Sequence, residues 1–321
     1  MVLVPGSIAL GLRQWAPPAV GEFAEPPTPL ALVSANGMIE LPGGSFVMGS
    51  SRALDAQAGQ YDAQPLHRVR LEPFWLDATP VTNRQFQRFV EQANYETDAE
   101  RKGNSLVFDR ELAAWREVTG ANWRNPTGPD GSLIGRQQHP VVHITWQDAV
   151  TYAAWANKRL LTEAEFEYAA RGGLSDCTYP WGRQRSESQL PLADRGRTNG
   201  LLAKVRLANG WQGHFPQQDL GQDGFRGTSP VGHFPPNRFG LYDMAGNVWN
   251  WCADWYAADF YGASLTDQPR GPSTGTERIR RGGSWLSAEN YGGGLRVGYR
   301  DHAPPGESTN HTGFRCARDV R

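Results

Sequence analysis

Cysteine is scarce in this sequence of 321 residues: the three present are Cys177, Cys252 and Cys316, and no two are spaced as Cys-x-x-Cys. An odd number of widely spaced thiols argues against a disulfide scaffold and a structural zinc site, and is typical of a reducing compartment. The first 12 residues are apolar, but no basic residue precedes them and Pro5 and Gly6 interrupt them. Because this is a poor signal peptide, we expect a cytoplasmic rather than an exported protein.

An excess of charge and a long hydrophobic run are also missing. The 32 basic and 33 acidic residues give a net charge of −1 and form no block of like charges, so we expect no nucleic-acid partner. No window comes near the ~18 consecutive apolar residues of a membrane helix, so we expect no membrane span. A glycine-rich phosphate loop before a helix and a Gly-x-Ser-x-Gly motif are absent, which argues against nucleotide-binding and serine-hydrolase functions.

Glycine, proline and tryptophan are abundant, with 37, 23 and 12 residues. Glycine supplies positive φ and proline fixes φ, so the chain should be rich in turns. A hydrophobic content of 39%, with 11% aromatic residues, still provides a core and argues against disorder. This composition favours a compact fold with little regular secondary structure over a helical bundle, a coiled coil or a repeat solenoid.

The N-terminal part of the chain divides into an arm and the start of a domain. Residues 1–36 are rich in proline and lack helical or strand periodicity, so we expect an extended arm before a domain over 37–321. Residues 38–49 predict a strand, a glycine turn and a second strand. The alternation over 69–76 predicts one half-buried strand.

Three helices are predicted from threonine caps followed by apolar residues at helical spacing. The first follows Thr82, the second follows Thr145, and the third follows Thr162. The third has the capping-box pattern, and Gly172 is expected to end it. After residue 179 we expect only short strands and turns.

Eight separated segments, in this order along the chain, resemble those of the formylglycine-generating enzyme (sulfatase-modifying factor) family over about residues 38–318. They are LPGGSFVMG (41–49), PVTN (80–83), HPVVH (139–143), KRLLTEAEFEYAARGG (158–173), YPWG (179–182), NRFGLYDMAGNVWNW (237–251), RGGSW (281–285) and GFRC (313–316). The resemblance implies an irregular α+β fold of the C-type-lectin-like kind, with little regular secondary structure. That fold agrees with the abundance of glycine, proline and tryptophan.

The resemblance also implies a chemistry, the oxidation of a sulfatase cysteine to formylglycine with O₂ and a copper ion held by two cysteines. Thiolates suit Cu(I) because they are soft donors. In this chain Ser287 and Gly292 occupy the two cysteine positions. A hydroxyl is hard and stays protonated, and glycine has no side chain, so we do not expect formylglycine generation by the copper route.

Three functions stay open for a family member without this thiol pair. The first is a binding protein whose groove, around residues 284–311, takes a small-molecule ligand or a polypeptide. The second is a metal-dependent oxidase or oxygenase on the same scaffold, with iron or copper. The third is a variable receptor protein of a diversity-generating retroelement, a class that has the same fold and a similar C-terminal segment.

The oxidase hypothesis requires a two-histidine-one-carboxylate set. Its best local ligands are His302 and His311, with Asp301, Glu307 or Glu289 as the carboxylate. No H-x-H or H-x-x-x-H spacing places two imidazoles on one element. Exposed loop histidines are therefore the simpler interpretation.

Residues of the groove follow from the resemblance and from the composition of the C-terminal loops. Trp249 and Ser284 match residues that line the family's substrate groove, although Trp249 could also pack in the core. Loop-borne tyrosine and serine are favoured in binding sites. The complete candidate set is Trp249, Ser284, Ser287, Tyr291, Arg296, Tyr299, His302 and His311.

Calcium is a further expectation from the resemblance, because the family binds it at two places through carboxylate, amide and carbonyl oxygens. The first place maps onto Asn209, Gly210, Asp223 and Phe225, and the second onto Asp243, Gly246, Val248 and Asn250. In the second set Asn250 stands where glutamate is usual, and Asp243 stands where asparagine is common. The alternative is that these residues only make turns beside glycine.

Overall fold

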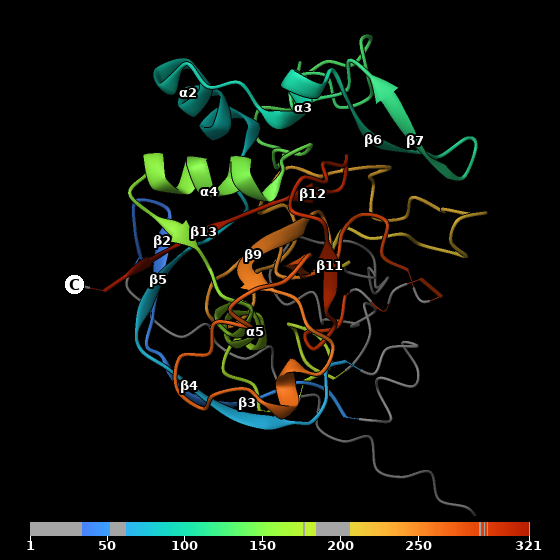
Figure 1. Ribbon diagram of the computed structural model, residues 1–321. Coiled ribbons are helices and arrows are strands. Elements are labelled where there is room, and N and C mark those ends of the chain that lie inside the picture. The colour runs from blue at the N-terminus through green and yellow to red at the C-terminus, as the bar shows by residue number, and fades with distance from the viewer. Residues whose placement is uncertain are drawn as a thin grey trace, which may run out of the picture.

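Small sheets, short helices and long loops make up the protein (Figure 1). The computed structural model describes residues 34–51, 62–175, 177–183, 206–288, 290–291, 293 and 295–320. Residues 1–33, nearly all of the expected arm, lie outside this description. Among the described helices none has the length and apolar character needed to cross a bilayer. The expected α+β architecture with little regular secondary structure is confirmed.

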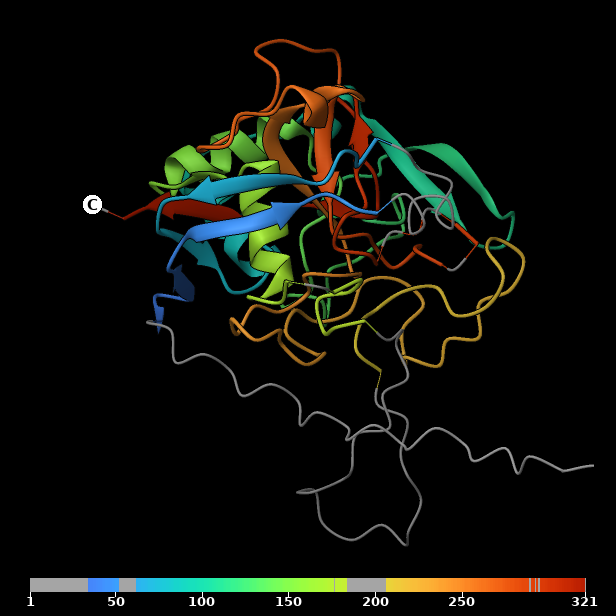
Figure 2. The same ribbon diagram turned by 90° about the horizontal axis from the view of Figure 1, so that it is seen from below.

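A five-stranded sheet joins the two ends of the described chain. Its strands, in spatial order, are β1 (Ser34–Ala35), β2 (Met38–Leu41), β5 (Phe74–Asp77), β13 (Cys316–Asp319) and β8 (Arg159–Leu160). Figure 2 shows β13, red and ending at the C-terminus, beside the strands from the start of the domain. Asn36 and Gly37 both have positive φ (53° and 75°), as a two-residue hairpin turn requires. The sheet therefore starts at residue 34, three residues before the expected domain boundary.

The segment 69–76 was expected to be one strand and is two. β4 (His67–Leu71) pairs with β3 (Gly44–Met48) in a separate two-stranded sheet, whereas β5 belongs to the five-stranded sheet. Pro73 lies between them, and proline has no N–H for a strand ladder. The prediction of a strand, a glycine turn and a strand over 38–49 is confirmed by β2 and β3.

All three predicted helices are present, and each begins directly after the expected threonine. In each one the threonine hydroxyl accepts the N–H of the third helical residue, whose side chain accepts the threonine N–H. Gly172, at φ 58°, ends the third helix in the left-handed conformation. The helices are α2 (Asn83–Ala93), α4 (Trp146–Trp155) and α5 (Glu163–Arg171), and a short α3 (Asp98–Lys102) was not predicted.

A four-stranded sheet carries the C-terminal motifs. Its spatial order is β11 (Asp301–Ala303), β10 (Arg278–Arg281), β9 (Trp249–Trp255) and β12 (Thr312–Gly313). A hairpin of β6 (Asn104–Asp109) and β7 (Ala114–Thr119) projects beside α3 (Figure 1) and was not predicted. It is tied to the C-terminal loop by a bridge between Leu106 and Thr309. A 3₁₀ turn, η1 (Phe260–Gly262), completes the described elements.

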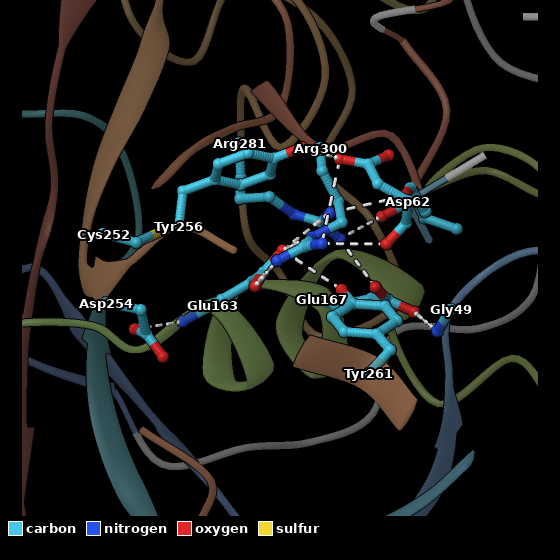
Figure 3. A network of polar contacts seen from close by, with 12 residues as sticks. Gly49, Asp62, Glu163, Glu167, Cys252, Asp254, Tyr256, Tyr261, Arg281 and Arg300 are labelled. Carbon is cyan, nitrogen blue, oxygen red and sulfur yellow. Dashed lines mark hydrogen bonds and ion pairs between the residues drawn. The ribbon is translucent and has the colours of Figure 1, made fainter. Parts of the chain in front are cut away.

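A buried network of ion pairs fastens this sheet to α5 (Figure 3). Glu163, the first residue of α5, accepts two hydrogen bonds from Arg300, of 2.7 and 3.1 Å. Glu167, one turn later, accepts hydrogen bonds from Arg281 at 2.6 Å and from Arg171 at 2.7 Å. All of these side chains are at most 9% exposed. Removing one partner from such a network is costly because it leaves the other charge buried and unpaired.

The charges of the network balance when Asp254 is neutral. Three guanidinium groups face the carboxylates of Asp62, Glu163 and Glu167. Asp254, on β9, is a fourth carboxylate, and it accepts the backbone N–H of Glu163 at 2.8 Å. Burial, reinforced by the negative charge of Glu163, raises its pKa to about 8.

We predict that Asp254→Asn flattens the pH dependence of stability between pH 5 and 8. Because the folded-state pKa is raised, the folded protein holds a proton that the unfolded chain releases near pH 4. Stability is therefore lost as pH rises toward 8, by up to about 1.4 kcal/mol per pH unit. Urea unfolding at several pH values measures this slope.

Asp130→Asn, at an exposed loop position, is the matched control and should keep the wild-type slope. An Asp254→Asn protein whose slope equals that of the wild type would show that Asp254 is already ionised at neutral pH.

Candidate functional site

The predicted groove residues meet at one end of the four-stranded sheet. β12 runs parallel to β9, with Thr312 opposite Trp249, and the Trp249 N–H donates to the His311 carbonyl oxygen at 2.9 Å. Ser284 lies three residues after the end of β10, and its Oγ is 3.1 Å from His311 Nδ1. The sheet thus brings together Trp249, Ser284 and His311, which are up to 62 positions apart in the sequence.

Ser287 holds a tight turn together with Ser284. The Ser284 N–H donates to Ser287 Oγ at 3.0 Å, and the Ser287 N–H donates to the Ser284 carbonyl oxygen at 2.9 Å. Ser287 is only 4% exposed. Its hydroxyl oxygen therefore accepts a hydrogen bond from the backbone of the turn. Gly292 lies outside the described residues.

Aromatic rings lie around the predicted groove residues, of which Trp249, Ser284 and His311 are at most 6% exposed. Tyr291, 41% exposed, stacks on Phe215 with 3.9 Å between the ring centroids. Trp249 and Tyr299 are 6.0 Å apart. Trp115, from β7, packs edge to face on His311 at 4.8 Å. Trp115 and Phe215 were not predicted here, because each comes from a segment that is distant in sequence and carries no motif of the resemblance.

A buried arginine organises the acidic residues of the groove, and it too was missed. Arg280 donates to Asp301 at 2.7 Å, to Glu307 at 2.8 Å and to the Thr312 hydroxyl at 3.1 Å. The two carboxylates considered as metal ligands are therefore bound to a guanidinium group. A sequence signal did exist, since Arg280 alternates with the buried Ile279 along β10.

The structure does not place His302 beside His311. His302 stacks on Tyr256 at 3.7 Å, and its Nδ1 is 2.9 Å from Glu277 Oε2. Successive side chains of a strand point to opposite faces, so His302 and Asp301 on β11 face different ways. In the sheet, β10 and β9 separate β11 from β12.

The described part of the chain contains no group of three or more histidine, cysteine, aspartate or glutamate side chains arranged to hold a metal ion. The expected set of His302 and His311 with a carboxylate is therefore not assembled by the residues that can be placed. Glu289, one of the carboxylates considered, lies outside them. Arg296 is half-buried, and no hydrogen bond or ion pair joins its side chain to another described groove residue.

Histidine in this region is held in its neutral form. Burial, together with the charge of Arg280, lowers the pKa of His311 well below its usual value. His143 lies deeper, where its ring nitrogens contact Ser105 Oγ at 2.7 Å and the Pro126 carbonyl oxygen at 2.9 Å. Burial lowers the pKa of His143 to about 4. His143 therefore satisfies buried hydrogen bonds.

Three of the four residues in the first set of calcium candidates lie together around the buried Asp223 carboxylate, whereas the Asn209 amide donates to the Gly227 carbonyl oxygen at 2.9 Å. Asp223 accepts the N–H groups of Phe225 at 2.9 Å and Gly210 at 3.2 Å. The Gln212 amide nitrogen donates to both Asp223 and the Gly210 carbonyl oxygen, which therefore converge on one point. Burial raises the pKa of Asp223. A carboxylate and a carbonyl oxygen that face one position, with only neutral donors on the carboxylate, are suited to a hard cation.

In the second set a guanidinium group contacts residues that were expected to bind calcium. Arg315 donates to Asn250 Oδ1 at 3.2 Å and to the Asp243 carbonyl oxygen at 2.9 Å. The Val248 carbonyl oxygen accepts the Asn250 amide at 3.1 Å. The Asp243 carboxylate accepts the Gly232 N–H at 2.8 Å. A buried guanidinium group therefore contacts two of the four residues of this set.

Comparison with known proteins identifies the fold and its relatives. Residues 23–320 match the family described as "Sulfatase-modifying factor enzyme 1-like domain". The chain is 46% identical to the formylglycine-generating enzyme of Thermomonospora curvata over 303 residues, which cover 89% of this chain and 94% of the relative. It is 37% identical to "Inactive C-alpha-formylglycine-generating enzyme 2" of Mus musculus, covering 87% and 85% of the two chains.

Among solved structures, PvdO from Pseudomonas aeruginosa is similar, with a TM-score of 0.63 and 29% identity. The match covers 91% of this chain and 99% of PvdO.

We predict that the His311 imidazole stays uncharged from pH 8 down to pH 5. Since its folded-state pKa is lowered, protonation would place an unsolvated charge next to Arg280. Proton NMR of the aromatic region, with the His311 signals assigned by their loss in His311→Gln, should show no shift over this range. A titration midpoint near 6.5 would mean that the ring is open to solvent.

Proposed function

Because the chain belongs to the sulfatase-modifying factor family, which includes formylglycine-generating enzymes, we propose that it keeps the family's groove but not its copper chemistry. The proposed activity is the binding of a ligand or polypeptide in the groove around residues 284–311. We propose that it does not convert cysteine to formylglycine.

One observation carries this proposal, the role of Ser287 in the turn that begins at Ser284. A copper-binding thiolate at this position would have to point its sulfur at the metal. The Ser287 oxygen instead accepts the Ser284 N–H at 3.0 Å and is buried. The three thiols of the chain cannot substitute for it, because Cys177, Cys252 and Cys316 are all buried in the core.

The names of the relatives are compatible with the loss of copper chemistry that we propose. The relative from Thermomonospora curvata carries the name of an active enzyme, whereas the mouse relative is named as inactive. Both are similar over most of their length, so sequence identity over the fold does not decide the chemistry. The donor atoms at the site are a better guide to the chemistry than sequence identity is. The oxidase alternative gains no support from the contacts, because His302 and His311 have separate partners.

We further propose that calcium stabilises this fold at one site, built on Asp223 and the Gly210 carbonyl oxygen. The convergence of these oxygens on the Gln212 amide supports a cation there. The second family position is left out of this proposal, because a positively charged group, Arg315, contacts Asn250 and the Asp243 carbonyl oxygen there.

We predict that the purified protein, supplied with Cu(I) and O₂, forms no aldehyde on a cysteine-containing sulfatase peptide, as measured by mass spectrometry. The double variant Ser287→Cys/Gly292→Cys should gain Cu(I) binding in competition with a chelator, because it restores two soft donors. The control Ser287→Ala/Gly292→Ala should not bind Cu(I). Aldehyde formation by the wild-type protein would refute the proposal outright.

We predict that calcium raises the melting temperature of the wild-type protein by about 5 °C at saturating concentration, since a ligand that binds only the folded state stabilises it. Asp223→Asn should abolish the calcium response, whereas Asp243→Asn should keep it. Differential scanning calorimetry with calcium or EGTA measures both. A response lost in Asp243→Asn and kept in Asp223→Asn would place the ion at the other site.

A further inference from the structure

A small cavity lies where the first turn of α5 meets β9 and the loop that follows η1. Its volume, about 10 Å³, leaves room for a single occupant of the size of a water molecule. The apolar part of its wall includes Met48 and Phe260, and none of the predicted groove residues lines it. The polar residues of the wall are Glu163, Asp254, Tyr261 and Ser264.

Asp254 brings an unused carboxylate oxygen to this cavity. The residue is only 3% exposed, and its Oδ2 accepts the backbone N–H of Glu163 at 2.8 Å (Figure 3). Its other oxygen, Oδ1, accepts no hydrogen bond from any residue that the structure describes. A carboxyl oxygen that is removed from bulk water is costly unless it has a partner. We therefore expect the occupant of the cavity to be the partner of Oδ1.

The two hydroxyl groups of the wall are already committed as donors. The Tyr261 hydroxyl donates to Glu163 at 3.1 Å, and the Ser264 hydroxyl donates to the Leu265 carbonyl oxygen at 3.2 Å. Each has one hydrogen, so both oxygens are left with lone pairs to offer. No lysine, arginine or histidine is found among the described residues that line the cavity. The wall therefore suits a hydrogen-bond donor or a cation.

The local charge has the sign that attracts a cation. The buried network has four carboxylates and three guanidinium groups, so it carries one excess negative charge when Asp254 is ionised. The negative charge of Glu163 raises the pKa of Asp254 more than the positive charge of Arg300 lowers it. Arg278 also senses the charge of Asp254, but its guanidinium lies between two tryptophan rings, at 3.7 and 3.4 Å from their centroids. A positive ion beside Asp254 would offset the excess charge.

We propose that this cavity binds a monovalent cation of about the size of a water molecule, such as Na⁺ or K⁺. Its ligands are Asp254 Oδ1 and the hydroxyl oxygens of Tyr261 and Ser264. Oxygen atoms are the ligands that hard cations prefer, and a single excess charge suits a monovalent ion. The ion and a proton are alternative ways to neutralise Asp254, so they compete. This inference goes beyond the proposed function, because the site shares no residue with the groove.

Melting of the full-length protein in different salts tests the proposal. The salts are NaCl, KCl and tetramethylammonium chloride at equal ionic strength and pH 8.5, with EGTA present to remove calcium. Tetramethylammonium is too large for the cavity. We expect NaCl or KCl to raise the melting temperature by about 3 °C over tetramethylammonium chloride when the ion is at ten times its dissociation constant. Equal melting temperatures in the three salts would show a cavity that holds only water, and would overturn the proposal.

Two variants separate this site from general effects of salt. Asp254→Asn removes the charge but keeps an oxygen for the Glu163 N–H, and it should lose the difference between the salts. Asp130→Asn, the exposed control, should keep the difference. A difference that persists in Asp254→Asn would place the ion elsewhere and refute the proposal.

Binding itself is measured by ²³Na NMR, which does not depend on unfolding. The wild-type protein should broaden the ²³Na signal, and added KCl should reverse the broadening, whereas tetramethylammonium chloride should not. Ser264→Ala, a change in a partly exposed loop, should weaken Na⁺ binding about fivefold, because it removes one ligand. Broadening that tetramethylammonium reverses equally, or an affinity that is unchanged in Ser264→Ala, would contradict the proposed site. None of these measurements involves copper or the groove, so the proposed function stands or falls separately.

Discussion

The ion pairs of Glu163 and Glu167 with Arg281 and Arg300 are the interaction on which the groove depends. Arg281 ends β10, three positions before Ser284, and Arg300 lies between Tyr299 and Asp301. Both arginines are fully buried against a single helix, α5. The two sides of the groove are therefore fastened to the same support, although most of the chain between them is loop. Because the charges are shielded from water, the geometry is well defined and the cost of breaking it is high.

Buried arginines also help to explain how a fold with so many loops can be stable. Backbone groups in loops need partners, and arginine supplies them, as Arg300 does for the Asp62 carbonyl oxygen and Arg315 does for the carbonyl oxygens of Tyr242 and Asp243. A guanidinium group has five N–H donors in a fixed plane, and can thus satisfy several loop carbonyls at once. Arg315 makes such contacts with residues that the sequence had indicated as calcium ligands, Asp243 and Asn250.

Local signals in the sequence were sufficient for the helices and for part of the sheet structure. Thr82, Thr145 and Thr162 begin their helices because a cap is satisfied within four residues of chain. Pairings between distant segments were not predictable in this way. Trp115 reaches the groove through a hairpin that joins the C-terminal loop. His302 was assigned to the groove as a residue of the C-terminal loops, but it lies on β11, where adjacent residues face opposite sides of the sheet.

At the turn between Ser284 and Ser287 the chain has the fold of its family but carries a serine where the resemblance implies a cysteine. The Ser287 hydroxyl oxygen stabilises this turn by accepting the Ser284 N–H at 3.0 Å. Ser287 is therefore part of the scaffold of the turn. Around this turn lie the His311 ring and the charged group that Arg280 forms with its two carboxylates. These are nitrogen and oxygen groups, whereas Cu(I) prefers soft sulfur donors.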